Sequence, residues 1–267
     1  MTSGLDPLRL DRLLTGRFGR PLKHLVATAS TQTVALKWAA SGAPEGAVVA
    51  ADHQTAGRGR WGRPWHSAPG ALIQFSVVLR PRLEASRLGL LSIATGVGCC
   101  EAMRACGLEA SLKWPNDVNV SGRKLAGMLI ETQSAGPRIA AAVAGIGINY
   151  RWLPEDMPED ISESATSMAA ECSARGLPLP GREEVLASVL RSLEDAYDTL
   201  SENPDGLVAE ASERSEVLGR EVLVWTPGED SYSGTARRIL ADGALEITTS
   251  SGPIRLEMGE ITRLREA

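Results

Sequence analysis

The sequence lacks the features that mark several common classes of protein. It has no excess of positive charge, since 28 Lys and Arg stand against 33 Asp and Glu for a formal net charge of −5, and this argues against nucleic acid as the main partner. It shows no apolar run of the length expected to cross a bilayer, and no basic start followed by the apolar core of a signal peptide. We therefore expect a cytoplasmic protein with no membrane and no nucleic-acid partner.

Cysteine is also scarce. Four cysteines occur, at positions 99, 100, 106 and 172, and no two have the Cys-x-x-Cys spacing of metal or redox sites. Three of them lie in an apolar helical pattern, where a free thiol behaves as a small hydrophobe, and this suits a reducing compartment. The length of 267 residues allows one large domain with a small addition.

The segment around which the chain is organised spans residues 52–65. It holds three glycines, three arginines and two tryptophans, so its backbone can approach a ligand closely while its guanidinium groups suit phosphate or carboxylate oxygens. The spacing of Gly57, Gly59 and Gly62 also matches the dinucleotide-binding fingerprint, but Arg63-Pro64-Trp65 makes a poor helix interior. A solvated basic loop without a ligand is the other alternative, which the two tryptophans disfavour. We predict a loop that closes over an anion.

Alternating and apolar runs predict a mixed α and β organisation for the rest of the chain. Two glycines, Gly145 and Gly147, interrupt an apolar strand, which often marks close approach of a ligand or another backbone. The first 20 residues offer at most a short helix at 7–14, too little for a DNA-binding winged helix. The predicted strands are 22–27, 47–51, 71–79, 112–114, 118–120, 123–132 and 138–150, with a Ser121-Gly122 hairpin turn joining the fifth and sixth, and the predicted helices are 30–40, 87–105, 183–200 and 204–214.

Near residue 215 the period of the pattern changes. Short runs at 217–225, 233–240, 244–249, 254–257 and 261–264 are separated by Pro227-Gly228, Asp242-Gly243 and Ser251-Gly252. Such spacing predicts a small five-stranded barrel. We expect a main domain at 1–214 and a barrel domain at 215–267 that packs on it, because about fifty residues is near the lower limit for independent folding.

A second informative stretch joins lysine, tryptophan, proline, asparagine and aspartate at a strand end. With it, the chain resembles the biotin–protein ligase family, in the form that lacks an N-terminal DNA-binding domain. The similarity covers nearly the whole chain, and its motifs occur in the family's order: Ser30-Thr31, Gln54 with residues 57–65, Lys113 to Asp117, Arg123 to Gly127, and Gly145-Ile146-Gly147-Ile148-Asn149.

This resemblance implies both a fold and a reaction. The implied fold is α+β, a mixed β-sheet flanked by helices and related to the catalytic domain of class II tRNA synthetases, with a small C-terminal SH3-like β-barrel. The implied reaction joins biotin and ATP to form biotinyl-5′-AMP, with Mg²⁺ on the phosphates. It then transfers biotin to one lysine of the biotin carboxyl carrier domain of an acyl-CoA carboxylase, the expected protein partner.

The resemblance also implies which residues bind biotin. The ureido head of biotin needs neutral hydrogen-bond partners, and side-chain-free glycines leave room for its ring. Without the resemblance, Ser30 and Thr31 are equally well explained as caps of a helix. Gln32 stands where the family usually has asparagine, which puts its own contact in doubt. The implied biotin-binding residues are Ser30, Thr31, Gln32, Gln54, Gly57, Arg58, Gly59, Arg60, Lys124, Gly127, Gly145 and Gly147.

A further implied set binds the nucleotide and performs the chemistry. Adenylation brings a carboxylate against a phosphate, so positive groups are needed to neutralise both. Taken alone, Lys113 and Asp117 are more typical of a surface ion pair, and core packing is the alternative for Trp65. The implied adenylate-binding residues are Arg58, Arg60, Arg63, Trp65, Lys113, Asn116, Lys124 and Asn149; the catalytic ones are Lys113, Arg58 and Asp117; and the metal ligands are Asn116 and Asp117.

Three other readings remain open from the sequence. A lipoate–protein ligase would use the same adenylate chemistry on a different acid, and a regulator would bind biotinyl-adenylate as a corepressor. A pure biotin-binding module would need neither Lys113 nor Asp117. The arginine-rich loop favours the biotin ligase, and we expect that loop to become ordered when ligand binds.

Overall fold

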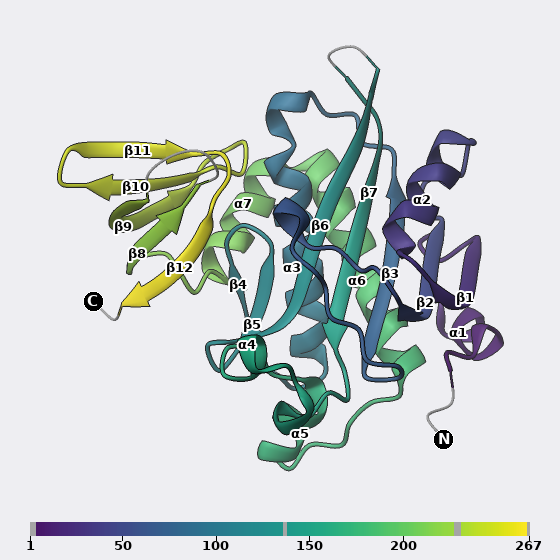
Figure 1. Cartoon of the computed structure of the whole chain (residues 1–267). Helices are drawn as coiled ribbons and strands as arrows, with labels where there is room; N and C mark the ends of the chain where they lie inside the picture. The colour runs from purple at the N-terminus through teal and green to yellow at the C-terminus, as the bar shows by residue number, and fades with distance from the viewer. Residues whose placement is uncertain (1–3, 136–137, 227–230, 266–267) are drawn as a thin grey trace.

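A computed structural model describes residues 4–135, 138–226 and 231–265 of the chain. Its described part contains two β-sheets, one of seven strands and one of five. Figure 1 shows the larger sheet, with its helices, at the centre and right, and the smaller sheet at the left. The predicted mixed sheet flanked by helices, with a small C-terminal unit of antiparallel strands, is confirmed.

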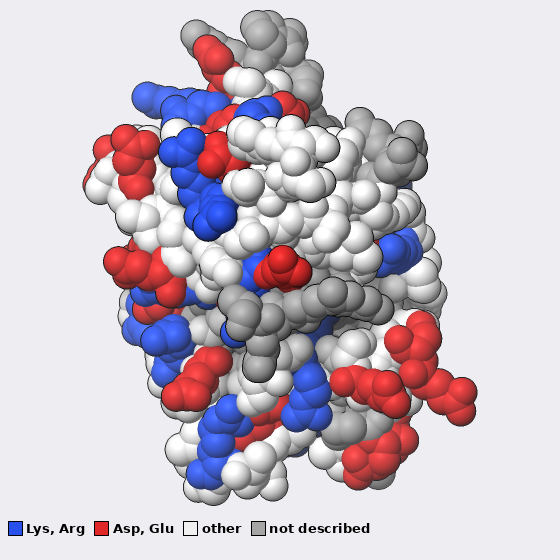
Figure 2. Space-filling model, turned by 90° about the vertical axis from the view of Figure 1, so that its left-hand side faces the viewer, with Lys and Arg blue, Asp and Glu red and all other residues white. Residues whose placement is uncertain are grey.

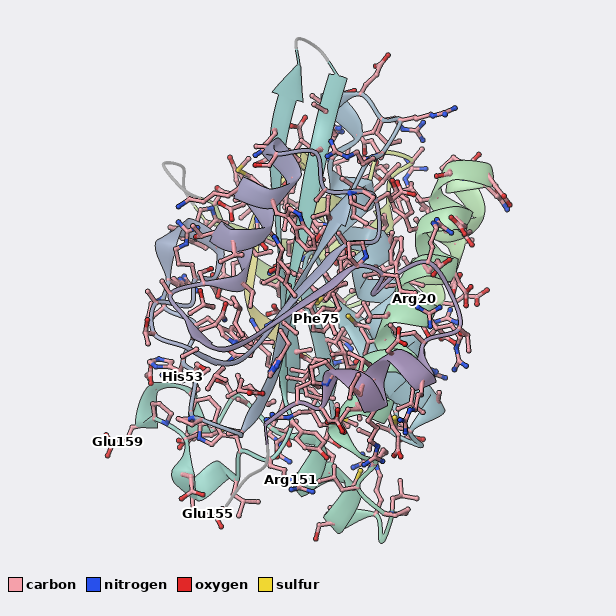
Figure 3. All side chains as sticks on the ribbon, turned by 90° about the vertical axis from the view of Figure 1, so that its right-hand side faces the viewer. Arg20, His53, Phe75, Arg151, Glu155 and Glu159 are labelled. Atoms are coloured by element: carbon pink, nitrogen blue, oxygen red, sulfur yellow. The ribbon has the colours of Figure 1, made fainter. Side chains whose placement is uncertain are left out.

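The larger sheet has the spatial order β1-β2-β3-β7-β6-β5-β4. Strands β1 and β2 are parallel, and every other neighbouring pair is antiparallel. The interior strand β3 is buried at every position, and Figure 3 shows Phe75 of this strand in the middle of the molecule. The strands are β1 (Leu22–Thr28), β2 (Val48–Gln54), β3 (Leu72–Leu79), β4 (Ala110–Lys113), β5 (Asp117–Val120), β6 (Arg123–Ala135) and β7 (Arg138–Asn149).

Helices cover both faces of this sheet. In Figure 1, α3 (Gly89–Ala105), α6 (Arg182–Glu202) and α7 (Pro204–Glu213) lie behind it, and α2 (Thr31–Ala40) lies in front of β2, β3 and β7. α2 fits closely because Ala35 and Ala39 on its inner side are small. α6 buries one stripe, as its sequence predicts, whereas α3 is apolar nearly all round and lies between the sheet and α6.

The stretch Ala85–Ala105, which contains α3, is long and apolar enough to cross a membrane by length and composition alone. The expectation that the chain has no such run was therefore wrong as stated. However, 67% of the apolar window is buried inside the protein, as in the core helix of a folded domain. Cys99 and Cys100 lie side by side in this helix and are buried. Burial raises the pKa of the Cys100 thiol to about 12, and buried thiols of this kind are unreactive.

Short elements complete the larger unit. They are α1 (Pro7–Leu13), the single turns η1 (Arg60–Gly62), η2 (Ala85–Arg87) and η3 (Pro154–Asp156), α4 (Glu159–Ser162) and α5 (Met168–Ala174). The predicted hairpin between β5 and β6 is confirmed, since Ser121 and Gly122 have positive φ angles of 53° and 73°, as a tight turn between antiparallel strands requires.

The smaller sheet has the order β11-β10-β9-β8-β12 and is antiparallel throughout. Its strands are β8 (Glu221–Trp225), β9 (Tyr232–Ile239), β10 (Leu245–Thr249), β11 (Gly252–Leu256) and β12 (Glu260–Arg265), close to the five predicted runs. The expected Pro227-Gly228 turn lies outside the described residues. Figure 2 shows basic and acidic side chains interspersed on this side of the molecule, so neither sign of charge dominates it.

The two sheets are joined by direct contacts. Trp114 Nε1 donates a hydrogen bond of 3.0 Å to the carbonyl of Gly243, and the side chain is 1% exposed. Gly89 at the start of α3 lies so close to the barrel that a Cβ added to it would be 2.8 Å from the carbonyl oxygen of Asp242, and a Cβ added to Gly243 would be 2.7 Å from the Gly89 backbone. The barrel therefore packs on the main unit through close backbone contact, and the domain boundary near residue 215 remains a proposal.

Candidate active site

A cavity of about 250 Å³ lies between the larger sheet, the segment joining β2 to β3 and the edge of β12. Figure 1 shows that segment, in dark blue, crossing in front of β6 and β7. The cavity is lined by Ser30, Thr31, Gln32, Gln54, Arg58, Gly59, Arg60, Trp61, Arg63, Pro64, Trp65, His66, Phe75, Ser76, Asn116, Asp117, Lys124, Gly127, Met128, Leu129, Gly145, Ile146, Gly147, Asn149, Trp152, Ile161, Ser164, Ala165 and Glu260.

One end of the cavity is built from uncharged polar groups. Ser30 is the N-cap of α2, but its side chain makes no capping hydrogen bond and has no partner among the described residues. Thr31 donates from its backbone N–H at 2.7 Å and from its hydroxyl at 3.0 Å to the side-chain oxygen of Gln54. Neutral donors and acceptors thus face the cavity from rigid elements, as expected of a site for a neutral polar group.

Gln32 closes the floor of this neutral end. Its Nε2 donates to the carbonyls of Leu129 (3.3 Å) and Val143 (3.0 Å), and its Oε1 accepts from Ser76 Oγ at 3.1 Å. A Cβ on Gly145 would lie 2.5 Å from that Oε1. Glycine at 145 therefore makes room for the Gln32 amide, whose hydrogen bonds described here are all to protein groups.

Trp65 forms the middle of the cavity wall. A Cβ added to Gly147 would lie 2.4 Å from its indole ring, and one added to Gly127 would lie 3.0 Å from it. The ring thus rests on two side-chain-free positions of adjacent strands, β6 and β7. Its Nε1 is buried and has no hydrogen-bond partner in the described part of the chain, so a ligand oxygen can satisfy this donor.

The other end of the cavity is charged, and Lys124 is at its centre. Its Nζ lies 2.7 Å from Asp117 Oδ1 and 5.7 Å from the centroid of the Trp65 ring. Two backbone hydrogen bonds fix Lys124 against the segment of Ser164 and Thr166, at 2.8 Å and 2.9 Å. The Asn149 side-chain amide donates to the carbonyls of Thr166 and Lys124. It therefore stabilises the contact between these two segments.

Arg60 connects the charged end to the barrel. Its Nη1 donates to Asn116 Oδ1 at 3.1 Å and to the carbonyl of Gly259 at 2.9 Å. Burial lowers the pKa of the Arg60 guanidinium below its usual value, and the carboxylates of Asp117 and Glu260 oppose this shift. A desolvated guanidinium of this kind gains from an incoming anion, which restores the favourable electrostatic contact that burial removed.

The glycine-arginine segment also contacts the barrel at the cavity mouth. Trp61 meets Trp225 edge-on, with ring centroids 5.1 Å apart, and Arg63 Nη1 donates to Glu260 Oε1 at 2.7 Å. Trp61 adopts a positive φ of 54°, which L-residues seldom do. We call this set of four side chains the mouth contact.

Arg58 lies at the rim, where its side chain is 48% exposed. Its Nη2 donates to Thr33 Oγ1 at 3.3 Å and lies 3.8 Å from Glu131 Oε2. These contacts are long, so little holds the guanidinium away from a ligand in the cavity.

Two predicted residues do not line the cavity. Lys113 is absent from the lining, and its neighbour Asp117 is paired with Lys124 instead, so the catalytic role of Lys113 stays a prediction without support from its position. Gly57 also lies outside; its carbonyl accepts from Trp65 N at 2.9 Å, which closes the loop. All the other predicted residues line the cavity.

Sequence reasoning missed several lining residues, notably Trp61, Ser76, Trp152 and Glu260. Glu260 pairs with Arg63 across 197 positions of the chain, and no local pattern links two such residues. Trp61 belongs to the glycine-arginine segment, and its position between Arg60 and Arg63 was the sequence feature that could have identified it as a lining residue.

The predicted magnesium ligands are engaged by cationic side chains of the chain itself. Asn116 Oδ1 accepts from Arg60, and Asp117 lies against Lys124. Among the described residues, no group of three or more His, Cys, Asp or Glu could hold a metal. The arrangement therefore does not fit a metal ion held by the protein alone.

Comparisons with known proteins agree with this geometry. The model of the biotin/lipoate A/B protein ligase family matches residues 26–149. The biotin–[acetyl-CoA-carboxylase] ligase of Mycobacterium tuberculosis is 34% identical over 262 residues, which cover 96% of this chain and 94% of that protein. A solved biotin protein ligase from Aquifex aeolicus, in complex with biotin and ATP, has a TM-score of 0.75 at 29% identity, covering 92% of this chain and 99% of that one.

A third relative differs in length. The bifunctional ligase/repressor BirA of Bacillus subtilis is 37% identical over 158 residues, or 59% of this chain, and the match spans about half (49%) of that protein. The near-complete match to the mycobacterial protein nevertheless decides the family. The chain belongs to the biotin–protein ligases of the biotin/lipoate A/B protein ligase family.

Proposed function

We propose that this protein is a biotin–protein ligase. In this proposal it activates biotin with ATP to biotinyl-5′-AMP and then transfers biotin to a lysine of a carrier protein. The observation that carries the proposal is the polarity of one continuous cavity, neutral and hydrogen-bonding at Thr31 and Gln54 and cationic at Arg60 and Lys124. Biotin has the same order of groups, an uncharged ureido head followed by an apolar chain and a carboxylate.

The neutral end holds the head of biotin. Ser30 offers a hydroxyl without a protein partner, and Gln54 offers a side-chain amide fixed by Thr31. The chain of biotin then runs along Gly147 toward Trp65, where the absence of a side chain leaves room. This orientation brings the carboxylate of biotin to Lys124, 2.7 Å from Asp117.

The charged end performs adenylation. An oxygen of the biotin carboxylate attacks the α-phosphorus of ATP, a P–O bond to the β-phosphate breaks, and pyrophosphate leaves with the electron pair. Lys124 and Arg60 neutralise the two anions as they approach, and each charge-assisted contact is worth about 1.5–3 kcal/mol. Trp65 supplies an aromatic face and Arg58 a half-exposed guanidinium at the rim. Magnesium would enter with the phosphates of ATP, since Mg²⁺ is commonly held by substrate phosphates and waters.

The second step needs a neutral amine. An unperturbed lysine has a pKa of about 10.4, so the acceptor must be deprotonated as it attacks the acyl carbon and releases AMP. Asp117 is our candidate for this proton. In the free protein its Oδ1 is paired with Lys124, so we infer that phosphate must first draw Lys124 away.

The proposal also covers the protein that accepts biotin and the cellular compartment of the reaction. A relative named biotin–[acetyl-CoA-carboxylase] ligase supports a carboxylase as the partner, and we propose its biotin carboxyl carrier domain as the acceptor. The described cysteines are all free thiols, which supports the cytoplasm as the compartment. The barrel would help to hold the nucleotide or the carrier through the mouth contact.

The experiment is ATP–pyrophosphate exchange with biotin, with lipoate or with no acid, followed by mass spectrometry of a carrier domain incubated with biotin and ATP. We expect exchange with biotin alone and a single biotinylated lysine. Exchange with lipoate alone would move the protein to the lipoate ligases of the same family. Binding of biotin without exchange would indicate a binding module or regulator.

A further inference from the structure

A chain of hydrogen bonds leads from the neutral end of the cavity to the periphery of the protein. It begins at Gln54, whose side-chain oxygen accepts from the backbone N–H of Thr31 at 2.7 Å. Because a backbone N–H can only donate, the amide of Gln54 must turn its oxygen toward α2. Its Nε2 then points the other way and donates to Gln74 Oε1 at 3.0 Å.

The orientation of the Gln74 side-chain amide is fixed as well, by the groups on the side away from Gln54. Its Nε2 donates to Ser67 Oγ at 2.8 Å and approaches the carbonyl of Asp52 at 3.5 Å. A carbonyl can only accept, so this amide also has one allowed orientation. Gln74 is 2% exposed and does not line the cavity, and thus reaches a ligand only through Gln54.

The outer end of the chain is Ser67 and His53. Ser67 Oγ accepts from Gln74 and also from the backbone N–H of Gln54 at 3.2 Å, which uses both of its lone pairs. Its own hydrogen is then directed to His53 Nδ1 at 3.3 Å. Figure 3 shows His53 near the border of the molecule, while Phe75, the neighbour of Gln74 on β3, lies at its middle. In this series of hydrogen bonds, each donor therefore points outward, in the direction from Thr31 to His53.

This fixed direction leaves one group of Gln54 for a ligand. Its Nε2 carries two hydrogens, one is used by Gln74, and the other has no partner among the described residues. Thr31 holds the oxygen of the Gln54 amide, and Gln74 holds its nitrogen. Without Gln74 as an acceptor, the amide would keep only its contacts to Thr31 and could pivot about its oxygen, so its second N–H would have no fixed direction. The direction of the chain thus decides that the cavity meets a donor, which suits the oxygen of a ureido or amide carbonyl.

We propose that Gln74 is a positioning residue for substrate recognition: it fixes the side-chain amide of Gln54 so that a free N–H faces the neutral end of the cavity. The inference rests on the proposed function and deepens it. According to this inference, the preference of the cavity for a head group with a hydrogen-bond acceptor depends on Gln74, a buried side chain that does not contact the substrate.

The test compares Gln74→Met with a matched control. Methionine keeps the length and apolar stem but removes both hydrogen-bonding groups. The control is Gln133→Met, since Gln133 is a partly buried glutamine of β6 whose Nε2 donates to the carbonyl of Leu36 at 3.0 Å, outside the cavity lining. In exchange assays we expect Gln74→Met to raise KM for biotin about five- to tenfold, with KM for ATP and kcat unchanged. Gln133→Met should change none of the three.

A conservative variant separates positioning from packing. Gln74→Glu keeps an oxygen toward Gln54 and, when protonated, a hydroxyl donor toward Ser67, so its KM for biotin should stay within about threefold of the wild type. The proposal is overturned if folded Gln74→Met keeps the wild-type KM for biotin, or if it alters KM for biotin and ATP equally.

A second measurement needs no substrate, so failure of the proposed function is distinguishable from failure of this inference. If the wild type gives no exchange with biotin, the biotin ligase assignment fails, and the positioning is then read from the side-chain ¹⁵N–¹H₂ signals of Gln54. We expect these two signals to lie away from the positions of a free glutamine side chain and to exchange slowly with D₂O in the wild type, and to move toward the free positions and exchange faster in Gln74→Met. Identical signals in the two proteins would overturn the inference.

Discussion

The two ends of the cavity are constructed in different ways. The neutral end is formed by the start of α2, the end of β2 and the middle of β3 and β7, and its polar side chains Thr31, Gln32 and Gln54 are each at most 9% exposed. The charged end combines Asp117 of β5 and Lys124 of β6 with a loop and the edge of the second sheet. In these last two parts the side chains of Arg63 and Glu260 are 56% and 33% exposed. The neutral end thus lies on buried elements, whereas the charged end draws partly on a loop and a sheet edge whose side chains are more exposed.

This difference matches the tasks proposed for each end. A small neutral head is recognised by direction and distance, which requires rigid hydrogen-bonding groups. Two reacting anions need positive charge, which Lys124 of β6 and the loop arginines Arg58 and Arg60 supply through long side chains. We therefore expect changes at the neutral end to act on the acid substrate, and changes at the charged end to act on ATP and on the rate.

The largest effect is expected where the two ends meet, at Gly147. In Gly147→Ala the new Cβ would lie 2.4 Å from the Trp65 ring, so the ring or the strand must move. We expect a loss of about a hundredfold in kcat/KM for biotin-dependent exchange, the size expected for a displacement of about 1 Å. The control is the same change in a Trp65→Ala background, where it should cost far less. An equal loss in both backgrounds would show that the ring is not the cause.

The next effect compares two lysines. Lys124→Met removes the cation paired with Asp117 in the cavity, so we expect kcat/KM for ATP in the exchange assay to fall about ten- to a hundredfold. Lys113→Met is the matched variant, and because Lys113 does not line the cavity we expect at most about a threefold loss. A larger loss for Lys113 than for Lys124 would restore the catalytic role that the family resemblance implied.

A third effect concerns the support behind Lys124. Glu171 is 2% exposed and binds Arg123 at 2.8 Å and the hydroxyl of Thr166 at 2.6 Å, and the backbone N–H of Thr166 donates to the carbonyl of Lys124. Glu171→Gln should lower the free energy of unfolding by about 2 kcal/mol at neutral pH. The exposed Glu163→Gln should leave it unchanged. Urea denaturation measures both, and equal stability of the two variants would contradict this account.

The same residue predicts a pH dependence. Burial alone would raise the pKa of Glu171, but hydrogen bonds from Thr166 and Arg175 and the nearby charge of Arg123 hold it below its usual value. A carboxyl with a lowered pKa in the folded state stabilises the protein fully above its unfolded pKa of about 4.3, and this contribution is lost as the pH falls through the folded pKa. The stability difference between wild type and Glu171→Gln should thus narrow below about pH 4. A constant difference would mean that the ionised form is not what matters.

The smallest effect is expected at the mouth contact. Trp225→Ala removes the edge-on contact with Trp61 and should raise KM for ATP about threefold, while Glu260→Gln should raise it less than about twofold, because an exposed ion pair contributes little. Both should leave KM for biotin unchanged. Glu246→Gln, which breaks an ion pair with Arg238 elsewhere in the barrel, is the control. A change in KM for biotin would contradict the division between the two ends.

The sequence predicted the framework of the molecule well, for local reasons. The stripe of α6 and the Ser121-Gly122 turn are each determined by neighbouring residues, as are the five short strands of the barrel. At the neutral end the pattern located the helix that begins at Thr31, but it ended the preceding strand at residue 51, whereas β2 runs on to Gln54. The family resemblance, not the pattern, placed both residues in one site.

The pairings at the charged end could not be predicted in this way. Lys113 on β4 and Lys124 on β6 are both near Asp117 in sequence and on the two strands that flank β5. Lys113 is even opposite Asp117 in the strand register, yet it is Lys124 that forms the pair. Likewise, the ring of Trp65 is placed by Gly127 and Gly147, which belong to strands 60 or more positions later. Long-range packing fixes these positions, and a single sequence does not contain that information in local form.

The most direct test of the account is a crystal structure of the protein with biotinyl-5′-AMP. The account predicts the ureido head within hydrogen-bond distance of Ser30, Thr31 and Gln54, and the phosphate within reach of Arg60 and Lys124, with Lys124 drawn away from Asp117. A ligand bound in the opposite direction, with its phosphate at Gln54, or a phosphate held by Lys113 while Lys124 keeps its pair, would contradict it.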